Sequence, residues 1–360
     1  MKIAFAVDTL NRASGIIKVV CNIAVALAQQ EDTEISIICT GKDPVSERYI
    51  PENICIYDLN IDGYGRRKKY LWYVRTLKNL FSIYKPDVLV VSGMEHVLFY
   101  QIASTIIPAT KKYAWEHRHF YAGPKFRLEW LGKRIALRKW NGVLCITKKD
   151  YEQYRAYHGS HKGIHQIYNL TDFSCSRNEY NEESAKIMSC GYLARIKGFD
   201  MLLDVAQKIF CEKPEWTWDI YGDGELRDFL KQEIYARGLE HNVRMMGYAP
   251  NVQELYKEYA FFVLTSRAEG MGMVLIEAQK AGLPILSFDI PCGPSDVIED
   301  GVNGYLIPPF DVDKMAERII ELIEDSERRK NFSDASEKYH AEFGKQVILE
   351  KWKDLLGLPS

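Results

Sequence analysis

Short apolar runs alternate with longer helix-like stretches along nearly the whole chain. In the first half, the strand-like runs are 2–7, 35–39, 54–57, 88–92, 112–115 and 142–147. Apolar stripes with helical period lie between them, notably over 16–29, 66–84 and 127–140. Such an alternation predicts a parallel sheet with helices on both faces.

A second alternating series follows the polar stretch 176–184, which has the composition of a linker. Its strands are expected at 187–190, 216–221, 243–246, 261–264, 285–287 and 304–306. Its helices are expected at 198–211, 224–237, 251–258, 274–281, 294–299 and 313–325. The 360 residues therefore predict an α/β protein of two Rossmann-like, doubly wound domains that face each other across a cleft. We expect one domain over 1–170, a second over 171–335, and a C-terminal helix within 336–360 that packs back on the first.

Charge is divided unevenly between the two halves. Residues 1–170 carry 25 Lys and Arg against 15 Asp and Glu, and the remainder carries 22 against 34. A basic first half indicates an anionic partner for that half. Its basic residues also stand beside aromatic ones, as in the run Arg66 to Lys69, which precedes Tyr70. The same pattern continues through Phe120, Lys125, Phe126, Arg127, Trp130, Lys133, Arg134, Arg138, Lys139 and Trp140. This pattern favours an anionic membrane surface, and a solvated basic face is the alternative.

Other features exclude several classes of protein. No apolar run approaches 18 residues, and the N-terminus lacks the apolar core of a signal peptide. The eight cysteines are scattered without a C-x-x-C pair, as expected of core thiols in a reducing cytoplasm. The loop after the first strand holds a single glycine, Gly15, so the dinucleotide fingerprint is absent. A nicotinamide-dependent oxidoreductase is therefore disfavoured, and no nucleic-acid-binding module is readable.

The stretch from 261 to 288 reads as strand, glycine loop, helix and strand. Such a loop directs backbone N–H groups and the positive end of a helix toward an anion. Glu269 and Glu277 bracket it; if wholly helical, their spacing places them about 80° apart around the axis and roughly 12 Å along it. This arrangement does not suit an acid–base pair acting on one bond. It suits two carboxylates that hold opposite ends of an elongated ligand.

A second glycine loop, GYLARIKGFD, follows the first strand of the second domain. Arg195 and Lys197 stand just before the helix that it opens. Two cations at a helix N-terminus predict a phosphate cradle, and a solvated basic loop is the alternative. The segments YGDGE (221–225) and MGY (246–248) also end strands and read as tight turns.

Taken together, these segments resemble glycosyltransferase family 4, a family of retaining enzymes with the two-domain GT-B fold. The SFDIPCGPSDVI stretch most resembles exopolysaccharide or amylovoran-type biosynthesis transferases. The resemblance covers essentially all of the second domain and is weak over the first. It is carried by residues 191–203, 218–230, 243–256 and 262–308.

The resemblance implies a role for each matching residue. Glu269 is expected to bind hydroxyls of the donor sugar, Glu277 the ribose hydroxyls, and Lys197 the diphosphate. The family usually has arginine where this chain has Tyr192, so Arg195 is the plausible substitute. The remaining donor-binding positions act through the backbone: Gly272, Met273 and Val274 toward the sugar and diphosphate, Tyr248 toward the nucleobase, and Gly15 toward the diphosphate or acceptor.

In the first domain, His117 aligns with the active-site histidine of the family and is expected to contact the donor sugar. His119 is the competing candidate. Asp311 and Asp313 have the D-x-D form of some metal sites, but their position before a helix favours capping. The resemblance implies no metal or cofactor, because Lys197, Arg195 and a helix N-terminus supply positive charge.

We therefore expect a cytoplasmic, peripherally membrane-associated glycosyltransferase. It would move a sugar from a nucleotide diphosphate sugar, a UDP-sugar being favoured, to a glycan or lipid-linked glycan acceptor during surface polysaccharide biosynthesis. Nucleic acid is not expected as a partner. The alternative is a catalytically silent protein that binds sugar nucleotides, and the presence of Glu269, Glu277 and Lys197 argues against it.

Overall fold

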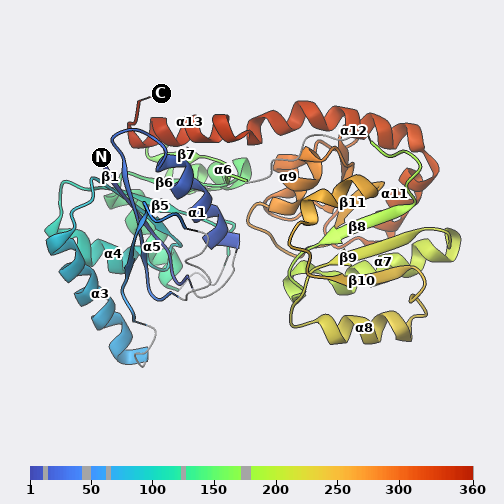
Figure 1. The fold of residues 1–360 in the computed structure, drawn as a ribbon, viewed down its shortest axis with the longest axis horizontal. Coiled ribbons are helices and arrows are strands. Elements are labelled where there is room, and N and C mark those ends of the chain that lie inside the picture. The colour runs from blue at the N-terminus through green and yellow to red at the C-terminus, as the bar shows by residue number, and fades with distance from the viewer. Residues whose placement is uncertain (11–14, 43–49, 62–65, 123–126, 172–179, 360) are drawn as a thin grey trace. The chain divides into compact units, whose positions relative to one another are not determined.

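The computed structural model describes residues 1–10, 15–42, 50–61, 66–122, 127–171 and 180–359. The chain divides into two compact units (Figure 1). Unit 1 comprises Met1–Thr171 and Lys345–Ser360, and unit 2 comprises Asp172–Gly344. The chain thus leaves unit 1 once and returns to it for its last helix.

Unit 1 is built on a seven-stranded parallel sheet with the strand order β3-β2-β1-β4-β5-β6-β7. Strand β1 pairs with β2 and β4, so that Ile3 lies opposite both Ile35 and Val88. These strands are nearly continuous apolar runs because helices cover both faces of the sheet. The strands are β1 Lys2–Ala6, β2 Glu34–Cys39, β3 Cys55–Asp58, β4 Val88–Ser92, β5 Lys111–Trp115, β6 Gly142–Cys145 and β7 Ile164–Gln166.

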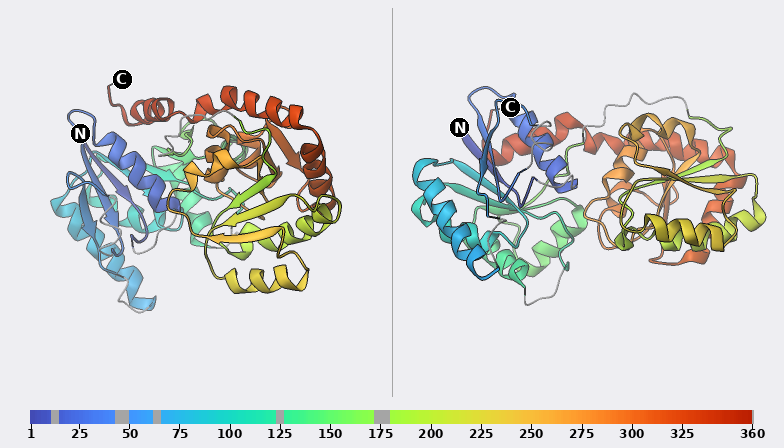
Figure 2. Two further views of the ribbon diagram at one scale, coloured as in Figure 1. Left: turned by 45° about the vertical axis from the view of Figure 1, so that its right-hand side comes forward. Right: turned by 60° about the horizontal axis from the view of Figure 1, so that its bottom comes forward.

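The helices of unit 1 lie on the two faces of this sheet (Figure 2). They are α1 Gly15–Leu27, α3 Arg66–Ile83, α4 Val97–Ala103, α5 Leu128–Lys139, α6 Lys148–His158 and α13 Lys345–Leu356, with a 3₁₀ turn at Ser104–Ile106. The C-terminal helix α13 is fixed to the sheet by a buried aromatic cluster. The ring of Trp352 lies 5.8 Å from that of Phe5 and 4.8 Å from that of Trp115. Tyr113 also donates a hydrogen bond to the Leu355 carbonyl at 3.3 Å.

Unit 2 is built on a six-stranded parallel sheet with the order β10-β9-β8-β11-β12-β13. Helices again form a layer on each face (Figure 2). The strands are β8 Lys186–Cys190, β9 Thr217–Tyr221, β10 Val243–Gly247, β11 Phe261–Leu264, β12 Ile285–Phe288 and β13 Gly304–Ile307. The helices are α7 Phe199–Glu212, α8 Arg227–Ala236, α9 Met273–Lys280, α10 Pro294–Val297, α11 Val312–Glu324 and α12 Ser326–His340. Short 3₁₀ turns occur at Arg195–Lys197, Val252–Glu254, Tyr256–Glu258 and Ala341–Phe343.

The prediction of two Rossmann-like α/β domains is confirmed, and all six strands expected in unit 2 are present. The helix expected over 251–258 is wrong, because that segment forms two 3₁₀ turns. Strand β7 and helices α4 and α6 were not predicted. The C-terminal segment expected to pack on the first domain, within 336–360, joins unit 1 from Lys345 onward. Helix α12 lies with unit 2 because it packs on α9 and α11.

Candidate functional site

Two loops meet at the carboxyl edge of the sheet of unit 2. Strands β8 and β11 are hydrogen-bonded neighbours and run parallel, so their following loops leave the sheet side by side. The loop after β8 forms the turn Arg195–Lys197 and enters α7. The loop after β11 passes through residues 265–272 and enters α9. This edge is where α/β sheets bind ligands.

Glycine allows these loops to pack backbone against backbone. Gly198 has φ +67°, and a Cβ there would lie 2.0 Å from the Thr265 carbonyl oxygen. A Cβ on Gly222, after β9, would lie 1.9 Å from the Gly191 carbonyl oxygen. No larger residue fits at either position without moving the backbone. The loops are therefore held in one arrangement by close contact.

Lys197 and Glu269 form an ion pair across these two loops. Lys197 Nζ donates to Glu269 Oε1 at 2.7 Å and to Oε2 at 2.8 Å. Ser266 Oγ donates to Oε1 at 2.6 Å. The Glu269 side chain is 7% exposed and that of Lys197 is 26% exposed. The structure thus brings together two residues that the sequence singled out separately, and adds Ser266, which it did not.

A second ion pair lies behind the first. The guanidinium of Arg267 binds both carboxylate oxygens of Asp200, at 2.6 and 2.7 Å, and donates to the Arg195 carbonyl at 2.9 Å. The hydrogen bond from Arg267 lowers the pKa of the Asp200 carboxyl. Sequence reasoning missed both residues. The only signal available was their place within the two glycine loops already identified.

Helix α9 begins beside Glu269. Gly272 is its N-cap with φ +70°, and Met273 and Val274, both half-buried, form its first turn. The first amides of a helix have no partner within the helix, so this end attracts anions. Leu275 N bonds the Gly272 carbonyl at 2.8 Å, which closes the first turn.

Glu277 lies one turn further along α9 and is half-buried. The hydroxyl of Tyr256 lies 3.4 Å from Glu277 Oε2, and the same hydroxyl lies 3.4 Å from Cys190 Sγ at the end of β8. Burial raises the pKa of the Tyr256 hydroxyl well above its usual range, with Cys190 and Glu277 adding to the effect. Tyr256 therefore remains a hydrogen-bond donor toward Glu277.

Three further residues of this edge are exposed. The Arg195 side chain is exposed, while its backbone carbonyl is used by Arg267. Tyr192 is 61% exposed and Tyr248, after β10, is 75% exposed. The loop carrying Tyr248 is joined to the β9 loop by a bond of 2.8 Å from Gly222 N to the Gly247 carbonyl. All the donor-binding positions predicted in unit 2 thus lie on this edge or on α9.

Unit 1 holds the predicted histidine at the corresponding end of β5. His117 is 7% exposed, and its ring lies 4.6 Å from that of Trp115. Burial lowers the pKa of His117 to about 3, so the imidazole is neutral. Among the described residues its Nε2 has no hydrogen-bond partner, and it lines a cavity of about 30 Å³ with Gly93 and Glu95. The competitor His119 is less buried, and burial lowers its pKa as well.

The interleaved basic and aromatic residues of unit 1 do not all lie on the surface. Lys133 is 1% exposed, its Nζ lies 3.3 Å from Glu116 Oε2, and it donates to the Phe120 carbonyl. Phe120, Trp130 and Trp140 belong to the hydrophobic core. The hypothesis of a membrane-facing surface is therefore wrong for these four residues.

Other members of the proposed membrane-facing set are exposed or undescribed. Helix α5 exposes three basic residues, Arg134, Arg138 and Lys139. The side chains at 66–69, and residues 125 and 126, lie outside the part of the chain that the structure describes.

Gly15 is the first residue of α1. A Cβ at this position meets no atom within 4 Å among the described residues, so none of these neighbours requires glycine here. The preceding residues, 11–14, lie outside the described part of the chain.

Asp311 caps helix α11, as predicted. Its carboxylate accepts a hydrogen bond of 2.9 Å from Lys314 N, and Asp313 forms an ion pair of 2.7 Å with Lys208. Across the described residues, no group of three or more His, Cys, Asp or Glu side chains is arranged to hold a metal ion.

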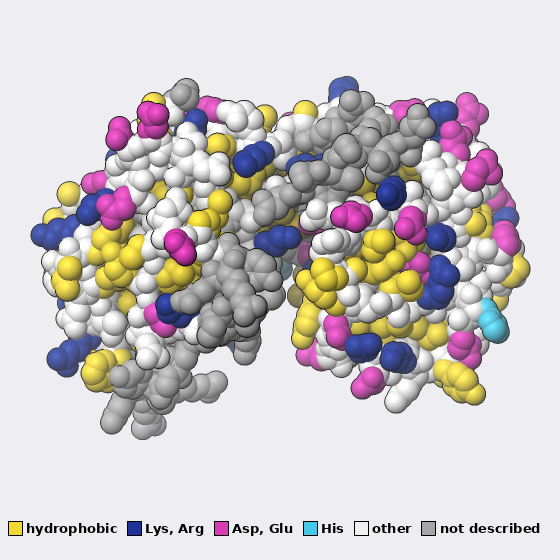
Figure 3. Space-filling view, in the orientation of Figure 1, with side chains coloured by type: hydrophobic (Ala, Val, Ile, Leu, Met, Phe, Trp, Pro, Cys, Tyr) yellow, Lys and Arg dark blue, Asp and Glu magenta, His cyan; other side chains and the backbone are white. Residues whose placement is uncertain are grey.

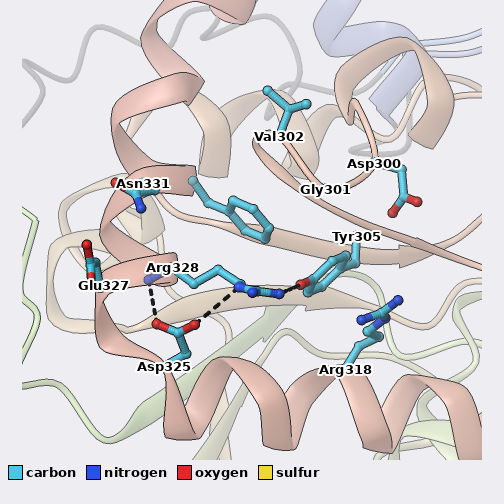
Figure 4. A pocket seen from close by; sticks show the side chains of 10 residues that line it. Asp300, Gly301, Val302, Tyr305, Arg318, Asp325, Glu327, Arg328 and Asn331 are labelled. Atoms are coloured by element: carbon cyan, nitrogen blue, oxygen red, sulfur yellow. Dashed lines mark hydrogen bonds and ion pairs between the residues drawn. The ribbon is translucent and has the colours of Figure 1, made fainter.

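A separate pocket of about 640 Å³ lies next to the residues that precede β13, away from the carboxyl edge (Figure 4). Its charged groups are engaged with one another. Arg328 bonds the Tyr305 hydroxyl at 2.8 Å and Asp325 at 3.2 Å, and Arg318 stacks on the Tyr305 ring at 4.6 Å. These contacts are accounted for by the packing of α11 and α12 on β13.

Comparison with known proteins identifies the family. The family described as Glycosyltransferase Family 4 matches residues 13–174, and the family described as Glycosyl transferases group 1 matches residues 173–339. The chain belongs to these glycosyltransferases. An uncharacterized glycosyltransferase of Haemophilus influenzae is 28% identical over 99% of both chains. The amylovoran biosynthesis glycosyltransferase AmsD of Erwinia amylovora is 30% identical over 59% of this chain and 61% of that protein.

The fold comparison agrees. A crystal structure of Anabaena Alr3699/HepE in complex with UDP superposes with a TM-score of 0.81 at 19% identity, covering 99% of this chain and 100% of that one. This likeness shows that the glycosyltransferase has the GT-B fold. Within its described residues, no helix combines the length and apolar character needed to cross a membrane.

Proposed function

We propose that this protein is a retaining glycosyltransferase that takes its sugar from a UDP-sugar. One observation carries the proposal: the Lys197–Glu269 ion pair stands beside the N-terminus of α9, at the carboxyl edge of a sheet, in a chain of a glycosyltransferase family. A lysine and helix amides suit a diphosphate, and a carboxylate suits sugar hydroxyls. The UDP preference rests on the likeness to the Anabaena protein solved with UDP.

The chemistry assigns a role to each charge. The bond from the sugar C1 to the phosphate oxygen breaks, and a bond from C1 to the acceptor hydroxyl oxygen forms on the same face. The acceptor proton passes to the leaving diphosphate. Lys197, Arg195 and the α9 amides stabilise the charge that develops on that diphosphate, without a metal ion or cofactor. Glu269 holds the sugar so that C1 faces the acceptor.

The remaining predicted residues complete the donor site in this proposal. Glu277, with the Tyr256 hydroxyl behind it, binds the ribose hydroxyls. The backbone near Tyr248 meets the base, and the backbone at Gly15 lies near the diphosphate or acceptor. Burial keeps the imidazole of His117 neutral above about pH 3, so it can donate a hydrogen bond to a sugar hydroxyl or accept one from it.

The acceptor is proposed to be a glycan or lipid-linked glycan of surface polysaccharide biosynthesis, met at the cytoplasmic face of the membrane. Helix α3 exposes Tyr70, Leu71 and Trp72, and α5 exposes Arg134, Arg138 and Lys139. On the visible face of unit 1, Figure 3 shows apolar side chains interspersed with single basic and acidic ones. Apolar and cationic groups together favour an anionic lipid surface.

A thermal-shift screen of UDP- and GDP-sugars tests the proposal most broadly. Ligands that bind only the folded state raise the melting temperature. A UDP-sugar is expected to raise it and to be consumed when an acceptor is added, with or without a chelator. If a UDP-sugar binds without turnover, the alternative of a silent sugar-nucleotide-binding protein is correct. If no nucleotide sugar binds, both readings fail.

A further inference from the structure

Arg267 joins the two loops of the donor site. It stands two residues before Glu269, and its guanidinium grips Asp200 in the first turn of α7 with two bonds of 2.6 and 2.7 Å. This parallel two-bond geometry fixes the direction of both groups, which a single bond does not. A third bond, of 2.9 Å, runs from the guanidinium to the Arg195 carbonyl.

The backbone of the same residue reinforces this junction. Arg267 N donates to the Ile196 carbonyl at 2.8 Å, and Thr265 Oγ1 lies 3.5 Å from the Lys197 carbonyl. Three consecutive carbonyls of the turn 195–197 therefore accept hydrogen bonds from residues 265–267. The backbone of Gly198 packs directly against that of Thr265, so the two segments cannot shift relative to each other without moving the backbone. Both segments continue directly into the ion pair, one through Lys197 and the other through Glu269.

We propose that Arg267 and Asp200 are positioning residues, which hold Lys197 and Glu269 at the separation that the donor requires. This inference rests on the proposed function of Lys197 and Glu269. Neither Arg267 nor Asp200 touches the donor in it. They act by keeping the turn 195–197 in register with the loop after β11, so that a diphosphate and its sugar find both partners already placed.

Burial separates this role from a general contribution to folding. The Arg267 and Asp200 side chains are 30% and 33% exposed. Partly exposed ion pairs contribute little to folding free energy. Loss of the pair should therefore affect ligand binding much more than the unfolding temperature. A control lies at the opposite end of α7, where the C-cap residue Lys213 forms an ion pair of 2.6 Å with Glu324.

The test measures the dissociation constant of UDP by calorimetry, and the melting temperature, for the full-length protein and its variants. Arg267→Gln and Asp200→Asn should each weaken UDP binding about tenfold with little change in melting temperature. The double variant should bind no worse than either single one, because the two side chains act as a unit. Arg267→Lys keeps the charge but not the two-bond geometry. Its affinity for UDP should lie between those of the unaltered protein and Arg267→Gln. Lys213→Gln, at the opposite end of α7, should bind UDP like the unaltered protein.

Lys197→Ala, measured alongside, distinguishes failure of this inference from failure of the proposed function. If Lys197→Ala binds UDP normally, the proposed function fails and the inference falls with it. If Lys197→Ala loses affinity while Arg267→Gln and Asp200→Asn do not, only the positioning role is overturned. The positioning role is also overturned if Arg267→Lys and Asp200→Asn lower the melting temperature markedly whenever they weaken UDP binding. The pair would then be merely structural.

Discussion

Lys197 Nζ lies 2.7 Å and 2.8 Å from the two carboxylate oxygens of Glu269, at the end of two neighbouring strands. The ammonium has three N–H donors, and two of them point at this carboxylate. A diphosphate arriving at the site can use the third donor or displace the carboxylate. Under the proposed function, the pair would couple recognition of the diphosphate to recognition of the sugar.

The close approach of the two loops predicts a strong dependence on Gly198. Gly198→Ala places a methyl group 2.0 Å from the Thr265 carbonyl oxygen, in addition to the cost of a positive φ. We expect a loss of more than about 3 kcal/mol in unfolding free energy. Gly238 has the same φ, +67°, with no atom within 4 Å of an added Cβ. Gly238→Ala should therefore lose only about 1–2 kcal/mol. Urea denaturation measures both, and equal losses would show that the loops are not in close contact.

The buried imidazole of His117 predicts a pH dependence of stability. Burial holds its pKa at about 3, against an ordinary value of 6.5. Below pH 6.5 the unfolded chain binds a proton that the folded chain does not, so stability falls as pH falls from about 6.5 toward 3. Between pH 7 and pH 5 this group alone should remove about 2 kcal/mol.

Urea denaturation at the two pH values isolates this effect when His117→Gln is compared with the unaltered protein. The variant should lose about 2 kcal/mol less than the unaltered protein between pH 7 and pH 5. His241→Gln, at an exposed position, should behave like the unaltered protein. Equal pH dependence in all three would mean that His117 is solvated.

Trp352 predicts that the C-terminal helix is part of the core of unit 1. Its ring is buried against Phe5 and Trp115, so Trp352→Ala should cost about 3–5 kcal/mol of unfolding free energy, measured by circular dichroism in urea. Trp72, which is partly exposed on α3, provides the control. A Trp352→Ala variant no less stable than Trp72→Ala would refute the packing of α13.

The exposed basic residues of α5 predict salt-sensitive membrane binding. Replacing Arg134, Arg138 and Lys139 by glutamine should weaken binding to vesicles that contain phosphatidylglycerol by up to about 1 kcal/mol per charge. Sedimentation with vesicles at low and high salt measures this. A control variant neutralises the exposed Arg227, Lys231 and Lys257 of unit 2. Equal binding by both variants would place the membrane contact elsewhere or exclude it.

Helices and strands were predicted correctly where apolar residues recur with a clear helical or strand pattern. The strands of both sheets are apolar runs, and their order along the chain indicates parallel sheets. Helix α6 was missed because KKDYEQYRAYH carries almost no apolar stripe, although Thr147 caps it through a bond to Asp150 N. Helix α4 was missed for the opposite reason, since VLFYQIA is too short and too uniformly apolar to show a helical period.

Pairing was harder to predict than residue type. Lys197 and Glu269 were each identified, but 72 residues separate them, and only the adjacency of β8 and β11 in the sheet brings them together. Lys133 looked like a surface cation because its partners, Glu116 and the Phe120 carbonyl, lie on a different element. Charge in a sequence shows which groups are present, and topology decides which of them meet.

The most direct test of the donor site is the turnover of Glu269→Gln, which keeps the shape of the side chain and removes its charge. The measurement is UDP release from the UDP-sugar selected by the thermal-shift screen, in the presence of a glycan acceptor. We expect turnover to fall at least about 100-fold, as for the loss of a group that stabilises the transition state, while the melting temperature stays within a few degrees and UDP still binds. Turnover close to that of the unaltered protein would contradict the assignment of Glu269 to the donor sugar.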